Sequence, residues 1–335
     1  MIQRRTLLTG TAAMLAMPAI VRAQAGKSYK IGAAVYGLKA EFMQLWVGAI
    51  KAHPAVRSGQ AAITVFDGQY DALTQSNQFD SMITQRFDAI IFVPIDAQAG
   101  ADAVAKAKAA NIPVIGSNTR VVGNDLTSYV GSDDVKAGTM EAEAVVKAMN
   151  GKGNVVIIEG PVGQSAEIDR GKGNREVLKA NPGVKVLEHK TANWSRAEAQ
   201  SLMENWLTAH PNQIGGIIGQ NDEMALGALQ AVKAAGMDPK KIPIAGIDGV
   251  SDAILAVKAG EMMSVLQDAN AQAQGALDVT LRRLAGESYQ PMGEAWKEYA
   301  AQMPWNNGTA AEYSVPWTPV TTANADALLA KRQKA

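Results

Sequence analysis

The sequence predicts an α/β protein with two lobes, each built on its own parallel sheet. Short apolar strands alternate with amphipathic helices along most of the chain, and 335 residues exceed what one hydrophobic core usually holds. Two segments also look like copies of each other: FDAIIFVPIDAQAGADAVAKAKAANIPVIGSN and QIGGIIGQNDEMALGALQAVKAAGMDPKKIPIAGID. Both run from a strand through an Ala-rich helix to Ile-Pro and a second strand, which is the pattern that two duplicated lobes would leave.

The first lobe is predicted from the alternation up to residue 130. Uninterrupted apolar runs of a few residues are typical of strands buried on both faces of a parallel sheet, and apolar residues at helical spacing predict the helices between them. The predicted order is a strand at 31–36, a helix to about 53, a strand at 63–66, a helix at 71–86, a strand at 89–93, a helix at 97–110, a strand at 113–116 and a short strand near 128–130.

A second series of the same kind begins at residue 135. The predicted order is a helix at 135–149, a strand at 155–158, a helix at 169–180, a strand at 184–187, a helix at 196–209, a strand at 214–219 and a helix at 224–235. Gly236 is a natural end for the last of these helices. Alternation of this kind implies parallel sheets with right-handed crossovers.

Three planar polar residues stand where the strand at 214–219 passes into the next helix. They are Gln220, Asn221 and Asp222. In an open α/β sheet the carboxyl edge of the strands is where small ligands bind. Alternatively, Asn221 or Asp222 caps the helix, and these three residues alone do not decide between the two roles.

Composition excludes several classes of function. Lys and Arg together number 32, as do Asp and Glu, and nucleic-acid or anionic-membrane binding would need a basic excess. Apolar residues make up 47%, enough to fill two cores, and no apolar tract after the first 25 residues is long enough to insert in a membrane. Cysteine is absent, so disulfides and thiolate chemistry are excluded.

Residues 1–25 read as a secretory signal peptide. Arg4 and Arg5 precede an apolar run at 11–21, and Ala23-Gln24-Ala25 supplies small residues for cleavage. A core helix is the alternative, but nothing amphipathic supports it. The arginine pair is a partial match to a twin-arginine leader, and no cysteine follows for a lipid anchor. We expect a soluble protein exported to the periplasm.

Motifs for catalysis or cofactor binding are absent. Neither G-x-S-x-G, a phosphate-binding loop, G-x-G-x-x-G nor HExxH occurs, so no enzyme activity, metal or cofactor is predicted. His53 and His210 precede prolines, where they could bond the last carbonyls of a helix, and His189 follows a strand. The segments 151–153 and 171–173, both Gly-Lys-Gly, look like turns.

Three segments resemble the ribose-binding-like periplasmic proteins of carbohydrate ABC importers, the type I periplasmic binding proteins. They are GKGNVVIIEGPVGQSAEIDRGKGN, LTAHPNQIGGIIGQNDEMALGALQAVKAAG and IAGIDGVSDAILAVKAGEM. The resemblance runs from about residue 30 to 290. It implies two Rossmann-like lobes joined by three hinge crossovers, near Gly131–Ser132, near Gln267 and in the C-terminal region. The implied N-terminal lobe is 26–131 with 268–296, and the C-terminal lobe is 132–267 with 297–335.

The resemblance also places ligand contacts in the second lobe. Arg170 in AEIDRGKG matches an arginine that bonds sugar hydroxyls, and Trp194 in TANWSRAEA matches an aromatic that stacks on the sugar. Asn221, Asp248 and Gln267 occupy the remaining polar positions. Planar groups of these kinds suit a neutral ligand with many hydroxyls, and aromatic walls suit its C–H faces.

Each assignment has an alternative. Arg170 could pair with Asp169 or Glu167 on a solvated helix, Trp194 could pack within a lobe, and Asp248 could be a turn residue because glycine follows it.

In the first lobe the resemblance is looser. Phe42 in LKAEFM matches a stacking aromatic, but Met43 stands where the family has a second one, and Ala40 where it has a polar residue. Asn118-Thr119 replaces an Asp-Arg pair, with Arg120 one place later. We take Phe42, Met43, Asn118, Thr119 and Arg120 as the candidates. Tyr36 and Lys39, at the end of the first strand, could reach the cleft, but nothing in the sequence assigns them there.

The C-terminal region contains Trp296, Trp305 and Trp317, half of the six tryptophans. Packing over a lobe surface is the favoured interpretation, with a role at the hinge or in partner binding as the alternative. Residues 323–332 could form a final helix.

The predicted function is capture of a sugar or sugar alcohol between the lobes and delivery to an ABC importer permease, by a protein that acts as a monomer. A binding protein for a signalling ligand or chemoreceptor is the nearest alternative. The effector domain of a sugar-responsive repressor would need a DNA-binding motif where the leader stands.

Overall fold

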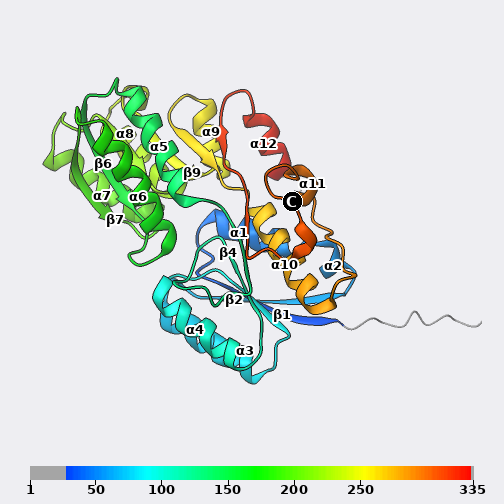
Figure 1. Cartoon of the computed structure of the whole chain (residues 1–335). Coiled ribbons are helices and arrows are strands. Elements are labelled where there is room, and N and C mark those ends of the chain that lie inside the picture. Colours follow the sequence, from blue (N-terminus) through cyan, green and yellow to red (C-terminus); the bar gives the residue numbers. More distant parts are fainter. Residues whose placement is uncertain (1–27, 333–335) are drawn as a thin grey trace, which may run out of the picture.

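The chain forms two α/β lobes, as the computed structural model of residues 28–332 shows (Figure 1). In spatial order, the first sheet contains β11 (Glu312–Ser314), β5 (Ser128–Gly131), β4 (Val114–Ser117), β3 (Ala89–Phe92), β1 (Tyr29–Val35) and β2 (Ala61–Asp67). The second contains β12 (Thr318–Val320), β10 (Met263–Leu266), β9 (Ile244–Asp248), β8 (Gly216–Gly219), β6 (Gly153–Glu159) and β7 (Val184–Thr191). The predicted fold class is confirmed. The expected signal peptide lies outside the described residues.

Helices pack against both sheets. Those on the first sheet are α1 (Glu41–Lys51), α2 (Pro54–Arg57), α3 (Ala72–Thr84), α4 (Ala97–Ala109), α10 (Ala269–Ala285) and α11 (Ala295–Glu298), with a 3-10 turn η2 (Asn306–Gly308). Those on the second are α5 (Asp134–Ala148), α6 (Ser165–Ala180), α7 (Arg196–Ala209), α8 (Asp222–Ala234), α9 (Ser251–Lys258) and α12 (Ala325–Arg332), with η1 (Pro239–Lys241). No helix in 28–332 combines the length and apolarity needed to cross a membrane.

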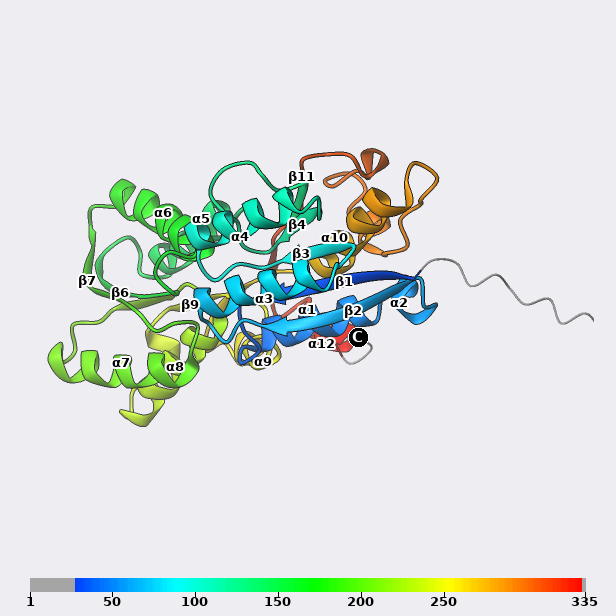
Figure 2. The ribbon, with the colours of Figure 1, turned by 90° about the horizontal axis from the view of Figure 1, so that it is seen from below.

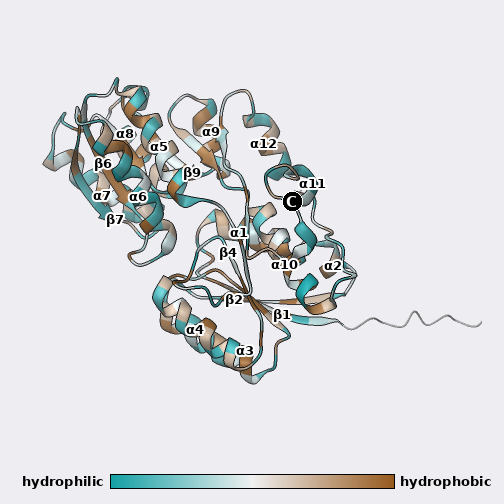
Figure 3. Ribbon diagram, viewed as in Figure 1, coloured by the Kyte–Doolittle hydropathy of each residue, from teal (hydrophilic) through white to brown (hydrophobic). Residues whose placement is uncertain are grey.

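The central strands form because their side chains are apolar on both faces. Every residue of β3 and of β8 is buried, and Figure 3 shows hydrophobic colour concentrated on such inner elements. In the edge strands β2 and β7 only the first residue is buried, and the others are partly or fully exposed. Pairing is parallel throughout both sheets except between β10 and β12.

Polar side chains begin most of the long helices. A side-chain oxygen accepts a hydrogen bond from the backbone N–H three residues later, which satisfies a group that the helix leaves unpaired. The residues that do so are Asp71, Asp96, Asp133, Ser195, Asn221 and Asp268. These caps fix where each helix starts at the carboxyl edge of its sheet.

The chain crosses between the sheets three times, as predicted. It leaves the first sheet after β5, returns after β10, and crosses again between β11 and β12. In the view of Figure 2 the long strands β1 and β2 extend toward the second lobe. The gap between the lobes therefore lies at the strand ends, with the crossovers beside it.

The C-terminal segment differs from the predicted lobe boundary. Residues 297–335 were expected in the second lobe, but β11 pairs with β5 in the first sheet, at Tyr313↔Val130 among others. Trp296 packs its ring edge against Trp305 and Tyr313, with ring centroids 4.6 and 5.0 Å away. Because this aromatic cluster sits on the first lobe, the chain reaches the second only at β12.

One buried carboxylate ties this C-terminal segment to the first lobe. Asp278 of α10 accepts hydrogen bonds from five groups: His53 Nε2 at 3.2 Å, the Tyr289 hydroxyl at 2.5 Å, Met292 N at 2.9 Å, Gly293 N at 2.8 Å and Trp296 Nε1 at 2.8 Å. The His53 side chain was expected to bond the last carbonyls of α1, but it does not. Its Nδ1 accepts a hydrogen bond from Ala55 N, so its Nε2 carries the hydrogen and donates to Asp278 Oδ1.

The second Gly-Lys-Gly segment is not a turn either. Residues 171–173 lie within α6, which begins at Ser165, before the predicted start. A Cβ placed on Gly173 would come within 2.2 Å of the Val135 carbonyl oxygen in α5. Glycine is needed here because the backbones of α5 and α6 are in contact where the two helices cross. This close contact fixes the position of Arg170, which lies one turn earlier in α6.

Candidate ligand-binding site between the lobes

A cavity of about 230 Å³ lies between the two lobes at the strand ends. Its lining comprises Tyr36, Phe42, Asn118, Thr119, Gln164, Ala166, Arg170, Trp194, Asn221, Asp248 and Gln267. Eight of the ten predicted contact residues are among them, from both lobes and from a crossover. This convergence follows from the topology, because parallel strands bring their carboxyl ends to one edge.

Arg170 is the central cation of the cavity wall. It is 3% exposed, and its guanidinium donates to Asp134 Oδ1 at 2.8 Å, to the Gln220 carbonyl at 2.6 Å and to Gln267 Oε1 at 3.3 Å. Burial alone lowers the pKa of Arg170, but the carboxylates of Asp134 and Asp248 raise it overall, so the group stays charged. Its ion pair is with Asp134, and not with Asp169 or Glu167 on its own helix.

Asp248 ends β9 with its carboxylate in the cavity wall. It is 4% exposed and adopts a φ of 125°, which is unusual for a residue other than glycine. Within residues 28–332 no group donates a hydrogen bond to this carboxylate, and Arg170 Nη1 is 3.9 Å away. Burial raises the pKa of Asp248 well above its usual range, against the opposing effect of Arg170.

Two amides add hydrogen-bond donors from the second lobe and the crossover. Asn221 Oδ1 accepts from Met224 N at 2.9 Å, so Asn221 caps α8 and also lines the cavity. Its Nδ2 has no acceptor among the described residues. Gln267 Nε2 is buried and likewise lacks a partner in that part of the chain. Unpaired buried amides of this kind cost free energy unless a ligand or water bonds them.

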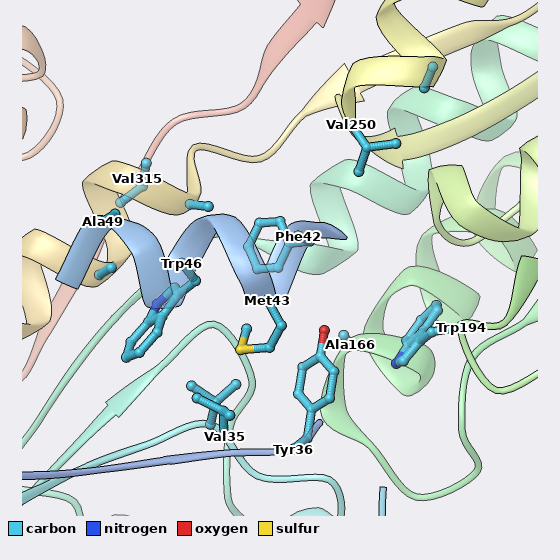
Figure 4. Packing of buried hydrophobic residues seen from close by; sticks show 14 of the residues in the cluster. Val35, Tyr36, Phe42, Met43, Trp46, Ala49, Ala166, Trp194, Val250 and Val315 are labelled. Carbon is cyan, nitrogen blue, oxygen red and sulfur yellow. The ribbon is translucent and has the colours of Figure 1, made fainter. Parts of the chain in front are cut away.

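Aromatic side chains form opposite walls. Phe42 comes from α1 of the first lobe and Trp194 from the loop before α7 of the second, and Figure 4 shows them on either side of the Tyr36 hydroxyl. Trp194 Nε1 donates to Gln164 Oε1 at 2.6 Å. A Cβ on Gly160 would come within 2.1 Å of the Trp194 ring, so this glycine makes room for it. Trp194 thus packs within its lobe and also faces the cavity.

Two of the predicted first-lobe contact residues, Met43 and Arg120, do not line the cavity. Met43 is fully buried and points into the core beside Val35 (Figure 4). Successive residues of a helix face about 100° apart, and here Phe42 faces the cleft while Met43 faces the core. Arg120 instead bonds Glu312 of β11 through both terminal nitrogens and lies over the Tyr129 ring, 3.8 Å from its centroid.

Three lining residues were not assigned from the sequence. Tyr36 stands at the end of a strand, which is a usable signal, but a single tyrosine there is equally common as core. Gln164 directly precedes α6 and donates to Pro94 O, and nothing in the sequence marks Ala166 as a lining residue. Lys39 does not line the cavity; its Nζ lies 5.9 Å from the Tyr70 ring centroid.

Direct hydrogen bonds join the lobes around the cavity. On one side Ala97 N donates to Gly163 O at 3.0 Å, and Gln164 Nε2 to Pro94 O at 3.0 Å. On another, the backbone N and hydroxyl of Ser251 both donate to Glu41 Oε1, at 3.0 and 2.6 Å. The lobes are therefore in a closed arrangement.

Across residues 28–332, no three His, Cys, Asp or Glu side chains are grouped as a metal site would require. The chemistry of the cavity is that of binding. One buried ion pair, one carboxylate, several amides and two aromatic walls fit a small neutral molecule with many hydroxyls.

Comparison with known proteins agrees with this. The chain is 44% identical over 218 residues to the xylitol-binding protein of Mycolicibacterium smegmatis, a match that covers 65% of this chain and 62% of that protein, less than two thirds of its length. It is 32% identical over 232 residues to the ribose import binding protein of Bacillus subtilis, covering 69% and 73%. The crystal structure of an ABC transporter solute binding protein from Bacillus halodurans with bound myo-inositol superimposes with a TM-score of 0.79 at 31% identity, covering 91% of this chain and 99% of that one.

All three are solute-binding proteins. The family model described as periplasmic binding protein domain matches residues 31–288, which is most of both lobes. Together with the two sheets, the three crossovers and the cavity between the lobes, this match shows that the chain belongs to the periplasmic binding protein family.

Proposed function

We propose that this protein captures a small sugar or sugar alcohol in the periplasm and presents it to the permease of an ABC importer. The observation that carries the proposal is the set of unpaired hydrogen-bonding groups in the cavity wall. Asp248 supplies acceptors, while Asn221 Nδ2 and Gln267 Nε2 supply donors, all within residues 28–332 and all buried. A ligand with adjacent hydroxyls can satisfy donors and acceptors at once.

Charge supports a neutral ligand. Arg170 and Asp134 form a buried pair that cancels. The remaining carboxylate, Asp248, accepts hydrogen bonds when ionised, and a ligand hydroxyl can donate to it. An anionic ligand would find no unpaired cation in the cavity wall, because Arg170 is already paired with Asp134, and burying an unpaired charge is costly.

The mechanism follows from the position of the cavity between lobes joined by crossovers. A ligand held by Arg170, Asp248 and Trp194 of the second lobe gains further contacts to Phe42 and Asn118 when the first lobe closes over it. Those added contacts favour the closed form, because a ligand shifts an equilibrium only by its different affinity for the two states. The closed monomer is then the form that the importer recognises.

The test is a thermal-shift panel on the chain without residues 1–25, with pentitols, tetritols, pentoses, hexoses and inositols. At a hundred times its dissociation constant a ligand adds about 2.7 kcal/mol of stability. For a chain of this size that corresponds to a rise in Tm of roughly 5 °C. A rise with one polyol or sugar, reduced by about half or more in Asp248→Ala, supports the proposal. A response only to amino acids or to charged signalling molecules contradicts it.

A further inference from the structure

Tyr36 enters the cavity from the first lobe, at the end of β1. The residue is 5% exposed, and Figure 4 shows its hydroxyl beside Ala166, between Phe42 and Trp194. In the part of the chain that the structure describes, this hydroxyl has no hydrogen-bond partner. This hydroxyl can therefore donate to or accept from a ligand that enters the cavity.

The ring is held in place from behind. Tyr70 packs against it with ring centroids 5.5 Å apart and planes at 59°. The Tyr36 carbonyl accepts from Tyr70 N at 2.7 Å, and Gln69 and Tyr70 take left-handed φ values of 53° and 60° to make that turn. A Cβ on Gly37 would lie 2.2 Å from the Tyr70 ring, so the space behind Tyr36 is filled. The Tyr36 side chain therefore cannot withdraw from the cavity.

The other polar first-lobe side chains of the cavity are already bonded. Asn118 Nδ2 donates to Gln272 Oε1 at 3.2 Å, and Thr119 Oγ1 donates to Pro94 O at 2.7 Å. Among the described residues, Tyr36 is thus the one polar first-lobe side chain in the cavity wall that makes no hydrogen bond to the protein.

Its ring also limits the space. The space between the cavity walls is about 230 Å³, including solvent at its mouth. A phenol ring is large compared with that space, and Phe42 and Trp194 already occupy the walls on either side of it. A smaller side chain at residue 36 would lengthen the cavity by about one ring.

We propose that Tyr36 is the first-lobe specificity determinant of this site. Its hydroxyl bonds a ligand oxygen when the lobes close, and its ring restricts the ligand to the size of a five-carbon polyol, excluding six-membered cyclitols. This inference rests on the proposed function and names the ligand class within it.

The experiment measures xylitol and myo-inositol binding by calorimetry for the wild type, Tyr36→Phe, Tyr36→Ser and the control Tyr70→Phe. Tyr70→Phe keeps both packed rings and removes a hydroxyl outside the cavity lining, so its affinities should match the wild type. Tyr36→Phe keeps the ring and loses one neutral hydrogen bond, which should weaken xylitol binding roughly three- to tenfold. Tyr36→Ser should weaken xylitol further and raise the myo-inositol to xylitol affinity ratio at least tenfold.

Unfolding midpoints without ligand separate binding from folding, and Tyr36→Phe should leave the midpoint unchanged. Xylitol affinity of Tyr36→Phe within twofold of the wild type overturns the hydroxyl contact. An unchanged affinity ratio in Tyr36→Ser, or a wild type that prefers myo-inositol, overturns the size restriction. A wild type that binds neither solute nor any other polyol or sugar overturns the proposed function itself, which is a different result.

Discussion

Replacing Asp278 by asparagine should destabilise the protein severely without touching the ligand cavity. The two carboxylate oxygens receive five donors, three on Oδ1 and two on Oδ2, the latter being Gly293 N and Trp296 Nε1. Asparagine has one oxygen, so its amide nitrogen must face at least the two donors now bonded to Oδ2. Hydrogen bonds to a charged group contribute about 1.5–3 kcal/mol each, which gives a loss of about 3–6 kcal/mol.

A loss of that size is a large part of the 5–15 kcal/mol that usually stabilises a domain. Urea unfolding followed by circular dichroism measures it, with two matched controls. Tyr289→Phe removes one of the five donors and should cost about 1.5–3 kcal/mol, less than Asp278→Asn. Asp326→Asn removes a carboxylate that is 74% exposed and paired with Lys258, and should cost less than 1 kcal/mol.

The pH dependence provides a second check. Burial by itself raises the pKa of Asp278, but the bonds from His53 and the other donors lower it below its usual value. A lowered pKa means that the ionised carboxylate stabilises the fold at neutral pH and that this stability is lost as the pH falls through the folded-state pKa. Asp278→Asn should lack this component. A variant whose unfolding free energy lies within 1 kcal/mol of the wild type, at equal urea sensitivity, would refute the reasoning.

Three further results are expected. Asp248→Ala should weaken ligand binding by 1.5–3 kcal/mol in calorimetry, since it removes a charged acceptor, and an unchanged dissociation constant would remove Asp248 from the site. Burial raises the pKa of Asp222 to about 7, so its ionisation lowers the free energy of unfolding as the pH rises from about 4 to 7. This loss is on the order of 4 kcal/mol in total, and it should be absent in Asp222→Asn. Urea titrations at several pH values measure it, and a variant with the same pH dependence as the wild type would contradict the assignment. Ser251→Ala removes a hydroxyl bond to Glu41, and X-ray scattering of the ligand-free protein should show a larger radius of gyration as the lobes part; an unchanged radius would show that this contact does not hold them closed.

The sequence predicted correctly those elements whose structure depends on residues close together in the chain. The strands at 89–93 and 214–219 are short apolar runs, and their burial on both faces follows from that pattern alone. Asn221, Asp248 and Gln267 stand at strand ends, so placing the strands places their side chains at the cleft. The resemblance to ribose-binding-like proteins added Arg170 and Trp194, which no periodicity would have selected.

The incorrect predictions concern residues whose position depends on contacts with distant parts of the chain. Arg120 is drawn from the cavity by Glu312, 192 residues later in the chain, and no local pattern reveals that pair. The same strand, β11, completes the first sheet and so moved the lobe boundary. Tyr36 was left unassigned because its burial and its unbonded hydroxyl can be seen only once Tyr70 and the second lobe are in place.

The last strands of the chain, β11 and β12, close the outer edge of one sheet each. A polypeptide that stops at residue 300 would therefore lose the border of both halves at once, although it would keep every cavity residue. Neither half can be made alone by shortening the gene from one end, since each is assembled from separate stretches. Isolating either would require a rearranged gene in which those stretches are spliced in a new order.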